Sequence, residues 1–386
     1  MNLLKTDSST ILVVDDSKPQ ASFIKQVLDQ EYETIVASNG LEALEKYKDE
    51  KPDLILLDIE MPEMDGYEVC QRIKTMIGDS FLPIIFITSK DDLDSLTKGL
   101  NIGGEDYLTK PFAPEELRAR VKAALRTKKL YRRLETTNEI IEKERDVIAN
   151  IQRGLLCDEH PEIPGFNFFS DYQPSSKAGG DYYDFIPIDR DHLGVLVSDV
   201  SGHGTPAAVI MVMMRVLTRS LVSQTHSPRE TLQKLNKTLR QNLETGYFIT
   251  TFYGVIHLPT KKMKYASAGH NPPILVNYNT GKVQELWLSK GIPLMILPNN
   301  DMEEGEIQLE PNSKLALYTD GLTEAKNEDG EQFGTKRLTQ TLLDLGKTLD
   351  AGQLGSQVKE TVQDFIGKQT FTDDYTLVIL EVTEGH

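Results

Sequence analysis

The chain has 386 residues, a length that predicts two or three domains at roughly 150 residues per domain. Its formal net charge of −17 argues against a nucleic-acid-binding protein, because DNA and RNA attract basic surfaces. The composition, with 39% hydrophobic and 26% charged residues, is typical of a soluble globular protein. An acidic surface of this kind favours solubility, and part of it can also hold divalent cations.

Targeting and redox features favour a cytoplasmic protein. The sequence contains no apolar run of about 18 residues, so we expect no membrane span. Met1 to Thr10 are polar and lead directly into an apolar strand, which is unlike a signal peptide. Cys70 and Cys157 are too few for a disulfide framework and too far apart for a zinc site.

Residues 11 to about 126 alternate short apolar runs with amphipathic helical stretches. This alternation predicts a doubly wound α/β domain, in which helices cover both faces of a parallel sheet. The five apolar runs that we expect to form its strands are Ile11–Val14, Thr34–Ala37, Leu54–Leu57, Pro83–Ile87 and Asp106–Leu108.

Polar residues follow these predicted strands at the edge where such sheets bind ligands. Asp15 and Asp16 end the first strand, and Asp58 ends the third. Thr88 ends the fourth strand, and Lys110 follows the fifth. Three converging carboxylates repel one another unless a cation such as Mg²⁺ lies between them. With a fixed lysine and a hydroxyl donor nearby, the pattern predicts phosphoryl transfer to a carboxylate.

Each of these residues alone has a simpler explanation, since an aspartate at a strand end often caps the next helix. Five suitable residues at successive positions favour a shared pocket instead. Residues 9–127 also resemble a bacterial response-regulator receiver domain, which has a flavodoxin-like fold. The motifs that carry the resemblance are Asp15-Asp16-Ser17, Asp58-Ile59-Glu60-Met61-Pro62 with Asp65-Gly66, Thr88-Ser89-Lys90 and Lys110-Pro111-Phe112.

The resemblance implies that Asp58 accepts a phosphoryl group from a sensor histidine kinase. It further implies that Mg²⁺ is held by Asp15, Asp16, Asp58 and the backbone carbonyl of Glu60. Tyr107 matches the switch aromatic of such domains, which turns inward when the residue at the position of Thr88 moves toward the phosphoryl group. The alternative for Tyr107 is an ordinary half-buried aromatic residue on a strand.

From Pro114 to Leu156 the only further glycine or proline is Gly154, which predicts one long helix. We expect its part within 128–157 to link two domains. Apolar residues there follow a heptad rhythm that is interrupted by Thr137 and Glu144. This favours a coiled coil that makes the protein a homodimer and transmits a signal, and the alternative is a helix that packs only on its own chain. The apolar residues of the rhythm are Leu130, Leu134, Ile141, Ile148, Ile151 and Leu155.

Residues 158–386 have a different pattern, in which strand-like runs are separated by turn residues and by helical stretches at Pro206–Val222 and Pro228–Leu243. Because strands and helices rarely alternate here, we expect an α+β sandwich flanked by helices. The expected strands lie at Gly194–Val197, Phe252–Leu258, Met263–Ala268, Ile274–Asn277, Leu315–Thr319 and Tyr375–Val382.

A second set of acids lies at the ends of these runs, beside glycine or other small residues. The set comprises Asp181, Asp199, Asp320 and the pair Asp373-Asp374. Because no histidines or cysteines cluster among them in sequence, hard ions such as Mg²⁺ or Mn²⁺ are favoured over zinc. Four separated carboxylates suit two ions that activate a water for hydrolysis of a phosphomonoester. For one Asp-Gly pair alone, an ordinary turn is the simpler explanation.

Residues from about 150 to 384 resemble the PPM-type phosphatases, specifically their bacterial RsbU/SpoIIE branch. The segment Asn150-Ile151-Gln152 to Leu155-Leu156 matches the entry to such a domain. The strongest motifs are Gly179-Gly180-Asp181-Tyr182-Tyr183-Asp184-Phe185, Asp199-Val200-Ser201-Gly202-His203-Gly204, Ala268-Gly269-His270-Asn271-Pro272-Pro273, Thr319-Asp320-Gly321 and Asp373-Asp374-Tyr375-Thr376.

The resemblance implies that Asp181 and Asp199 hold one metal ion. Asp199 would bridge to a second ion with the carbonyl of Val200, and Asp320 and Asp373 would complete that ion's ligands. Asp374 occupies a position where relatives place an acid or an amide, and it is a further candidate ligand.

Two histidines are candidates for other roles. His203 could serve as a general acid, although relatives often have lysine at this position. His270 lies in a turn motif, where a role in turn geometry competes with a chemical role.

Together these features predict a Mg²⁺/Mn²⁺-dependent serine/threonine phosphatase controlled by phosphorylation of Asp58. The resemblance implies a phosphorylated anti-sigma-factor antagonist of the STAS type as substrate, in a partner-switching pathway. One alternative is a non-enzymatic adaptor that uses a phosphatase-like domain only to bind partners. Another is a DNA-binding response regulator, which the net charge and the lack of a basic recognition helix disfavour.

Overall fold

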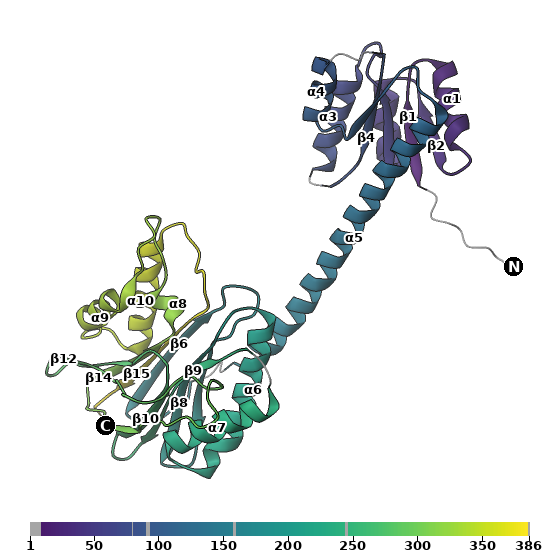
Figure 1. The fold of residues 1–386 in the computed structure, drawn as a ribbon. Coiled ribbons are helices and arrows are strands. Elements are labelled where there is room, and N and C mark those ends of the chain that lie inside the picture. The colour runs from purple at the N-terminus through teal and green to yellow at the C-terminus, as the bar shows by residue number, and fades with distance from the viewer. Residues whose placement is uncertain (1–8, 79, 90–92, 157–159, 244–245, 385–386) are drawn as a thin grey trace. The chain divides into compact units, whose positions relative to one another are not determined.

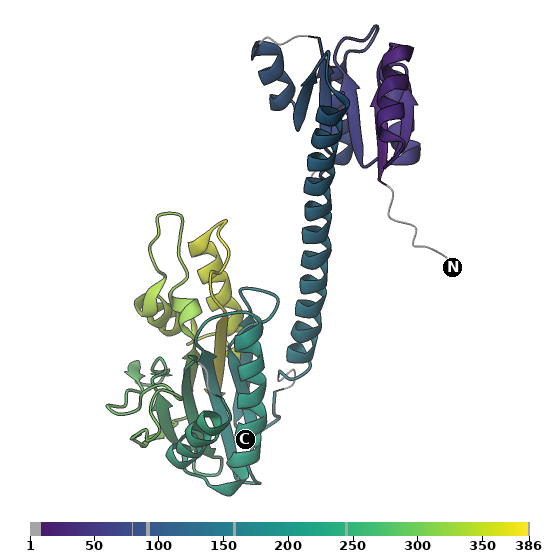
Figure 2. The ribbon, with the colours of Figure 1, turned by 45° about the vertical axis from the view of Figure 1, so that its right-hand side comes forward.

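The structure, a computed structural model, describes residues 9–384 except 79, 90–92, 157–159 and 244–245. The expectation about the first eight residues and the positions Lys90 and Cys157 therefore lie outside the described residues. The chain forms two compact units, residues 1–141 and 142–386. The border between the units falls within helix α5 (Pro114–Arg153), which Figure 2 shows as one continuous helix.

The first unit contains a parallel sheet with the strand order β2-β1-β3-β4-β5 (Figure 1). The strand order reverses at β1, so a ligand site is expected beyond the carboxyl ends of β1 and β3. The strands are β1 (Thr10–Val14), β2 (Glu33–Ala37), β3 (Leu54–Asp58), β4 (Ile84–Thr88) and β5 (Asp106–Thr109). The helices that accompany α5 are α1 (Lys18–Leu28), α2 (Gly40–Glu50), α3 (Gly66–Ile77) and α4 (Leu93–Asn101).

Successive residues of β1 pack on opposite faces of this sheet. Leu12 and Val14 belong to the core that includes residues of α2 and α3. Ile11 and Val13 belong to the core that α1 and the first turns of α5 cover. Burial of both faces explains why these strands are continuous apolar runs, and the doubly wound fold expected from the sequence is confirmed.

The second unit contains two antiparallel sheets, with strand orders β13-β10-β9-β8-β7 and β12-β11-β14-β15-β6. The strands of the first sheet are β7 (Tyr182–Pro187), β8 (His192–Val200), β9 (Ile249–His257), β10 (Lys262–Ala268) and β13 (Gly305–Gln308). The strands of the second are β6 (Phe166–Gln173), β11 (Ile274–Asn277), β12 (Lys282–Glu285), β14 (Ser313–Tyr318) and β15 (Tyr375–Val382).

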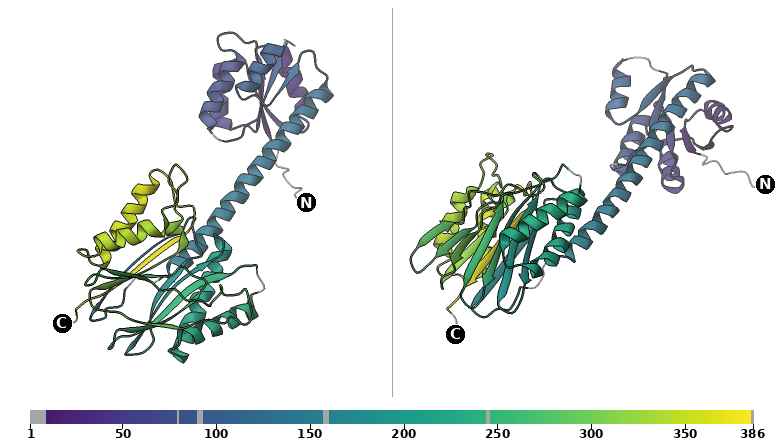
Figure 3. Two further views of the ribbon diagram at one scale, coloured as in Figure 1. Left: turned by 60° about the vertical axis from the view of Figure 1, so that its left-hand side comes forward. Right: turned by 60° about the horizontal axis from the view of Figure 1, so that its bottom comes forward.

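The two sheets of this unit stack as a sandwich with helices on the outside (Figure 3). Three apolar cores hold the layers together. The central core lies between the two sheets and includes Val197, Phe252 and Leu380. The outer cores lie under the helices, with α6 (Thr205–Leu221), η1 (Val222–Gln224) and α7 (Pro228–Asn242) on the first sheet. Helices α9 (Gly334–Leu345) and α10 (Ala351–Ile366) cover the second sheet, and α8 (Asp320–Thr323) is a short turn. The expected α+β sandwich is confirmed.

Among the described residues, one stretch, Thr205–Gln224, is long and apolar enough to cross a membrane by length and composition. A core helix of a soluble domain passes the same test, so the stretch is weak support for a membrane span. Its residues Met211 and Met214 are fully buried in the core beneath α6 and α7.

Candidate functional site

The first candidate site lies at the carboxyl ends of β1 and β3, where three aspartates converge. Carboxylate oxygens of Asp15, Asp16 and Asp58 all lie within 4.8 Å of one another. Asp15 and Asp58 are buried, whereas Asp16 is exposed. The set thus offers oxygen ligands to a cation that arrives from the Asp16 side, as Mg²⁺ requires.

Lys110 provides the positive charge of this site. Its Nζ donates to Asp58 Oδ2 at 2.7 Å and to Asp15 Oδ2 at 3.2 Å. Burial lowers the pKa of Lys110, but pairing with Asp58 and Asp15 raises it more. The pKa of Lys110 therefore lies above the usual value for lysine. Burial also raises the pKa of Asp58, although Lys110 offsets part of this effect. The Asp58 carboxylate is therefore paired with the Lys110 ammonium and buried away from bulk water.

The remaining receiver residues lie at neighbouring strand ends. Thr88 is fully buried at the end of β4, and its carbonyl accepts a hydrogen bond from Lys110 N at 2.8 Å. The Glu60 N–H points toward Asp58 Oδ1 at 3.3 Å. Tyr107 is half-buried on β5, with the Arg120 guanidinium 5.9 Å from its ring centre. The structure thus brings the predicted switch residues to the same edge of the sheet.

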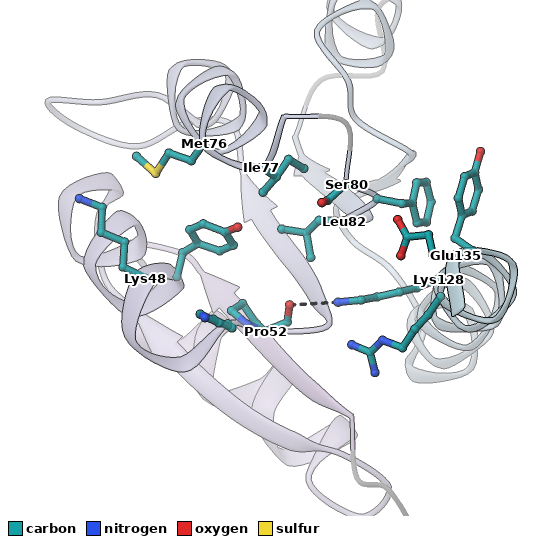
Figure 4. A pocket seen from close by; sticks show the side chains of 13 residues that line it. Lys48, Pro52, Met76, Ile77, Ser80, Leu82, Lys128 and Glu135 are labelled. Atoms are coloured by element: carbon teal, nitrogen blue, oxygen red, sulfur yellow. Dashed lines mark hydrogen bonds between the residues drawn. The ribbon is translucent and has the colours of Figure 1, made fainter. Parts of the chain in front are cut away.

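A cavity of about 540 Å³ lies elsewhere in this unit (Figure 4). It is lined by residues that precede β3 and β4, such as Pro52 and Leu82, and by Lys128 of α5. Lys128 Nζ donates to the Pro52 carbonyl at 3.3 Å. Because these segments lead into the strands, the cavity is at the opposite end of the sheet from Asp58 and takes no part in its chemistry.

The second candidate site lies where strand ends of the two sheets of the sandwich meet. Tyr182 pairs with Ser198, which places Asp181 and Asp199 at the same end of β7 and β8. Asp320 follows β14, and Asp373 and Asp374 directly precede β15. Among the described residues, no three of these acids bring ligand atoms within 4.8 Å of one another. This set is therefore more spread out than the receiver acids.

The charges of these acids show that they face one another. Burial raises the pKa of Asp199 to about 7, with further contributions from the charges of Asp320, Asp373 and Asp374. Burial and the charge of Asp199 raise the pKa of Asp181, and burial and the charge of Asp373 raise that of Asp320. Carboxylates that disfavour one another's charge in this way make this end of the sandwich a candidate cation site.

The two carboxylate oxygens of Asp181 differ in their hydrogen bonding. The hydroxyls of Thr319 and Thr376 both donate to its Oδ2 at 2.7 Å. Its other oxygen, Oδ1, is buried and has no hydrogen-bond partner among the described residues. A buried acceptor without a partner is costly, so the two threonines hold a carboxylate whose free oxygen fits a metal ion.

Asp374 has a different environment from the other acids. Its Oδ1 accepts hydrogen bonds from Ser175 N at 2.7 Å and Ser175 Oγ at 2.9 Å. Its Oδ2 accepts from Gly180 N at 2.6 Å. These bonds hold the loop that carries Asp181, and they favour a positioning role for Asp374 over that of a metal ligand. The close approach depends on small residues, because a Cβ at Gly179 would overlap the Asp374 carboxylate and one at Gly321 its backbone carbonyl.

Gln152, near the end of α5, contacts the same loop. Its side chain is buried, donates to the Gly179 carbonyl at 2.7 Å and accepts from Gly179 N at 3.1 Å. The sequence comparison with relatives pointed to the segment around Gln152 but gave this residue no role. The sequence signal for Gln152 was its place in the segment from Asn150 to Leu156 that matches the entry to a phosphatase domain.

The two candidate histidines lie in contrasting environments. His203 is exposed and lines a cavity of about 470 Å³ together with Arg145, Lys177 and the start of α6. His270 is buried, and its Nδ1 pairs with Thr250 Oγ1 at 2.8 Å. Burial lowers the pKa of His270 to about 4, so this ring is neutral near pH 7 and suits a structural role.

Comparison with known proteins finds a family match in each unit of the chain. The sequence profile of the family described as Stage II sporulation protein E (SpoIIE) matches residues 189–383, and that of the response regulator receiver domain matches residues 11–122. Phosphoserine phosphatase RsbU of Bacillus subtilis is 30% identical over 242 residues, which cover 62% of this chain and 70% of RsbU.

Two other relatives resemble single parts of the chain. The Bacillus subtilis regulatory protein PhoP is 45% identical over 117 residues, which cover 30% of this chain and only 48% of PhoP. The SiaA-PP2C domain of Pseudomonas aeruginosa superposes with a TM-score of 0.55 at 23% identity, and the match covers 64% of this chain and 99% of that domain. At 23% identity, the likeness to the SiaA-PP2C domain concerns the fold alone. The chain belongs to the SpoIIE family of PPM-type phosphatases and carries a response-regulator receiver domain ahead of its phosphatase domain.

Proposed function

We propose that the chain is a two-component response regulator whose output is the hydrolysis of phosphoserine or phosphothreonine in a protein. The observation that carries the proposal is Asp181, whose Oδ1 is buried and unpartnered among the described residues while other acids converge on it. Such an arrangement serves no structural purpose without a cation, since the carboxylates only destabilise one another. We propose domain boundaries at 9–127, 128–157 and 158–386.

The proposed ligands of two Mn²⁺ or Mg²⁺ ions are Asp181, Asp199, Asp320, Asp373 and the backbone carbonyl of Val200. Bound ions of this kind lower the pKa of a coordinated water and neutralise charge on the phosphoryl group. Thr319 and Thr376 orient Asp181, and Asp374 fixes the loop before it. His203 lines the same cavity as Arg145 and Lys177, which pair with Glu142, and it is the candidate for a general acid.

In the receiver, we propose that Asp58 is the phosphoacceptor and that a sensor histidine kinase is the phosphodonor. Asp15, Asp16, Asp58 and the carbonyl of Glu60 would hold Mg²⁺. Lys110 is already paired with Asp58 and would stay beside the added phosphoryl oxygens. Thr88 and Tyr107 would respond to that change at the ends of β4 and β5.

The proposed substrate is a phosphorylated anti-sigma-factor antagonist of the STAS type, in a cytoplasmic partner-switching pathway. This rests on the similarity to RsbU, which is named a phosphoserine phosphatase. Purified full-length protein with Mn²⁺ should release phosphate from such a substrate. Calorimetric titration with Mn²⁺ addresses the adaptor alternative, because a domain that only binds partners would take up no metal in its phosphatase half.

We further propose that α5 couples the receiver to the metal site through Gln152. Gln152→Ala would remove both hydrogen bonds that its side chain makes with the buried backbone of Gly179, at a cost of about 1–3 kcal/mol for a group left unpaired. We expect the Mn²⁺ concentration for half-maximal activity to rise about tenfold or more. The exposed Gln224, whose amide donates to the Ser220 carbonyl at 3.4 Å, offers a matched control in Gln224→Ala. An unchanged Mn²⁺ dependence in Gln152→Ala would refute this coupling.

Homodimerisation through α5 completes the proposal. Leu130, Leu134, Ile141 and Ile151 of the heptad set are between 40% and 59% exposed on this helix. Pairing with the same stripe of a second copy would remove their apolar surface from water. We expect Leu134→Glu to shift the protein from dimer to monomer in sedimentation equilibrium, whereas the charge change Arg133→Glu should leave the dimer intact. A wild-type protein that sediments as a monomer would contradict the pairing.

A further inference from the structure

A group of two histidines and an aspartate lies on the surface of the second unit. Asp189 lies in the turn between β7 and β8, His192 is the first residue of β8, and His226 directly precedes Ser227, the N-cap of α7. His192 Nδ1 lies 2.9 Å from Asp189 Oδ1, and His226 Nε2 lies 2.8 Å from Asp189 Oδ2. The ligand atoms of all three side chains fall within 4.8 Å of one another.

The rings of this group are arranged face to face and remain open to solvent. The imidazoles of His192 and His226 stack with centroids 4.0 Å apart and an interplanar angle of 15°. The side chains of Asp189, His192 and His226 are 43%, 22% and 53% exposed, so an ion can reach them from water. His257 is close by, with its ring 4.9 Å from that of His192, but its Nδ1 pairs with Thr260.

The donor set differs in kind from the acids of the phosphatase site. Two imidazole nitrogens and one carboxylate suit Zn²⁺, Ni²⁺ or Cu²⁺, whereas Mg²⁺ prefers oxygen ligands alone. Tetrahedral Zn²⁺, with bonds of about 2.0–2.2 Å, places its ligand atoms roughly 3.3 Å apart. The nitrogen–oxygen distances of 2.8 and 2.9 Å would open by a few tenths of an ångström. The stacked, solvent-exposed rings would also have to turn so that both nitrogen lone pairs point at one ion. Each ring would carry its proton on its other nitrogen.

We propose that Asp189, His192 and His226 form a binding site for one Zn²⁺ or a similar borderline transition-metal ion, with water as a fourth ligand. The site is separate from the proposed catalytic metals. His192 begins β8 and Asp199 lies seven residues further along the same strand, a distance of about 23 Å at roughly 3.3 Å per residue. An ion here would tie the β7–β8 turn to the segment that enters α7.

The test is a calorimetric titration of untagged full-length protein with Zn²⁺ in the presence of excess Mg²⁺, which keeps the oxygen-ligand sites supplied with a hard ion. We expect one Zn²⁺ per chain, and an affinity at least about 100-fold lower in His192→Ala and in His226→Ala, because loss of even an outer-sphere partner costs 10–100-fold. His257→Ala is the matched control and should bind like wild type. Co²⁺ should give the intense visible absorption of a tetrahedral site in wild type and not in His226→Ala.

A second readout follows from linkage between binding and folding. Zn²⁺ should raise the Tm of wild type, because an ion that binds only the folded state stabilises it. In His226→Ala the same addition should leave the Tm unchanged, while far-ultraviolet circular dichroism confirms the fold of the metal-free variant. Equal Zn²⁺ affinity in wild type and both histidine variants would overturn the proposal. Absence of any Zn²⁺ binding to wild type in excess Mg²⁺ would do the same.

Discussion

Asp199→Asn is expected to lower Mn²⁺-dependent phosphatase activity by at least about 10³-fold, since metal ions supply several kcal/mol of transition-state stabilisation. Asp199 is the acid on which the charges of Asp320, Asp373 and Asp374 act, and in the proposed site it would be the ligand shared by two ions. An amide has neither the charge nor the second strong oxygen ligand that a bridge needs. Phosphate release from a phosphorylated STAS-type protein measures the loss.

Asp301→Asn provides a matched control, because Asp301 is exposed and pairs only with Lys290 at the surface. It should retain wild-type activity. Activity of Asp199→Asn within a few fold of wild type would rule out a two-metal site built on this residue.

Asp199→Asn should also stabilise the metal-free protein against unfolding. The pKa of Asp199 is raised from 3.8 to about 7 in the folded state, so between these values the folded chain binds more protons than the unfolded chain. The unfolding free energy of the metal-free protein therefore falls progressively as the pH rises from about 4 to about 7. Asparagine removes the charge, and we expect the chelator-treated variant to be more stable at pH 7 by about 1–3 kcal/mol. Denaturant unfolding of both proteins would measure the difference.

Asp58→Asn is expected to abolish phosphorylation of the receiver completely. The carboxylate oxygen is the nucleophile in acyl-phosphate formation, and an amide cannot replace it. Incubation with acetyl phosphate and Mg²⁺, followed by mass measurement of the intact chain, would detect the added phosphoryl group. Asp49→Asn changes an exposed acid of α2 and should be phosphorylated normally. Phosphorylation that persists in Asp58→Asn would assign the acceptor to another residue.

Lys110→Ala should also impair control of the phosphatase by the receiver, but for a different reason. It removes the cation that lies 2.7 Å from Asp58 and 3.2 Å from Asp15, so two buried carboxylates would lose their charge partner. We expect the acyl phosphate to form and to lose its effect on the phosphatase domain, because its oxygens no longer have a fixed partner near Thr88.

The receiver site could be predicted from the sequence because local rules place its residues. Parallel strands end at one edge of the sheet, so acids after β1 and β3 and Lys110 after β5 must lie near one another. The long helix was expected from the absence of helix-breaking residues, and α5 covers Pro114–Arg153 of the predicted 114–156. In the second unit, the motifs predicted acids at strand ends. The lack of β-α-β alternation among the strand-like runs predicted the sandwich.

Other features depend on contacts between residues far apart in the chain, which patterns do not reveal. The bonds from Asp374 to Ser175 and Gly180 span about two hundred residues, as do those from Thr376 to Asp181. The group of Asp189, His192 and His226 forms only because the segment before α7 returns to the β7–β8 turn. Helix α10 does have a local signal in the sequence, since Asp350 and Gln353 form a capping box at its start.

We propose that phosphorylation of Asp58 controls hydrolysis at the metal-acid site. The most direct measurement is the rate of phosphate release by full-length protein with Mn²⁺ and a phosphorylated STAS-type substrate, with and without beryllofluoride as a phosphoryl mimic. The two rates should differ in wild type and become equal in Asp58→Asn. Equal rates in wild type would contradict control of the phosphatase by its receiver.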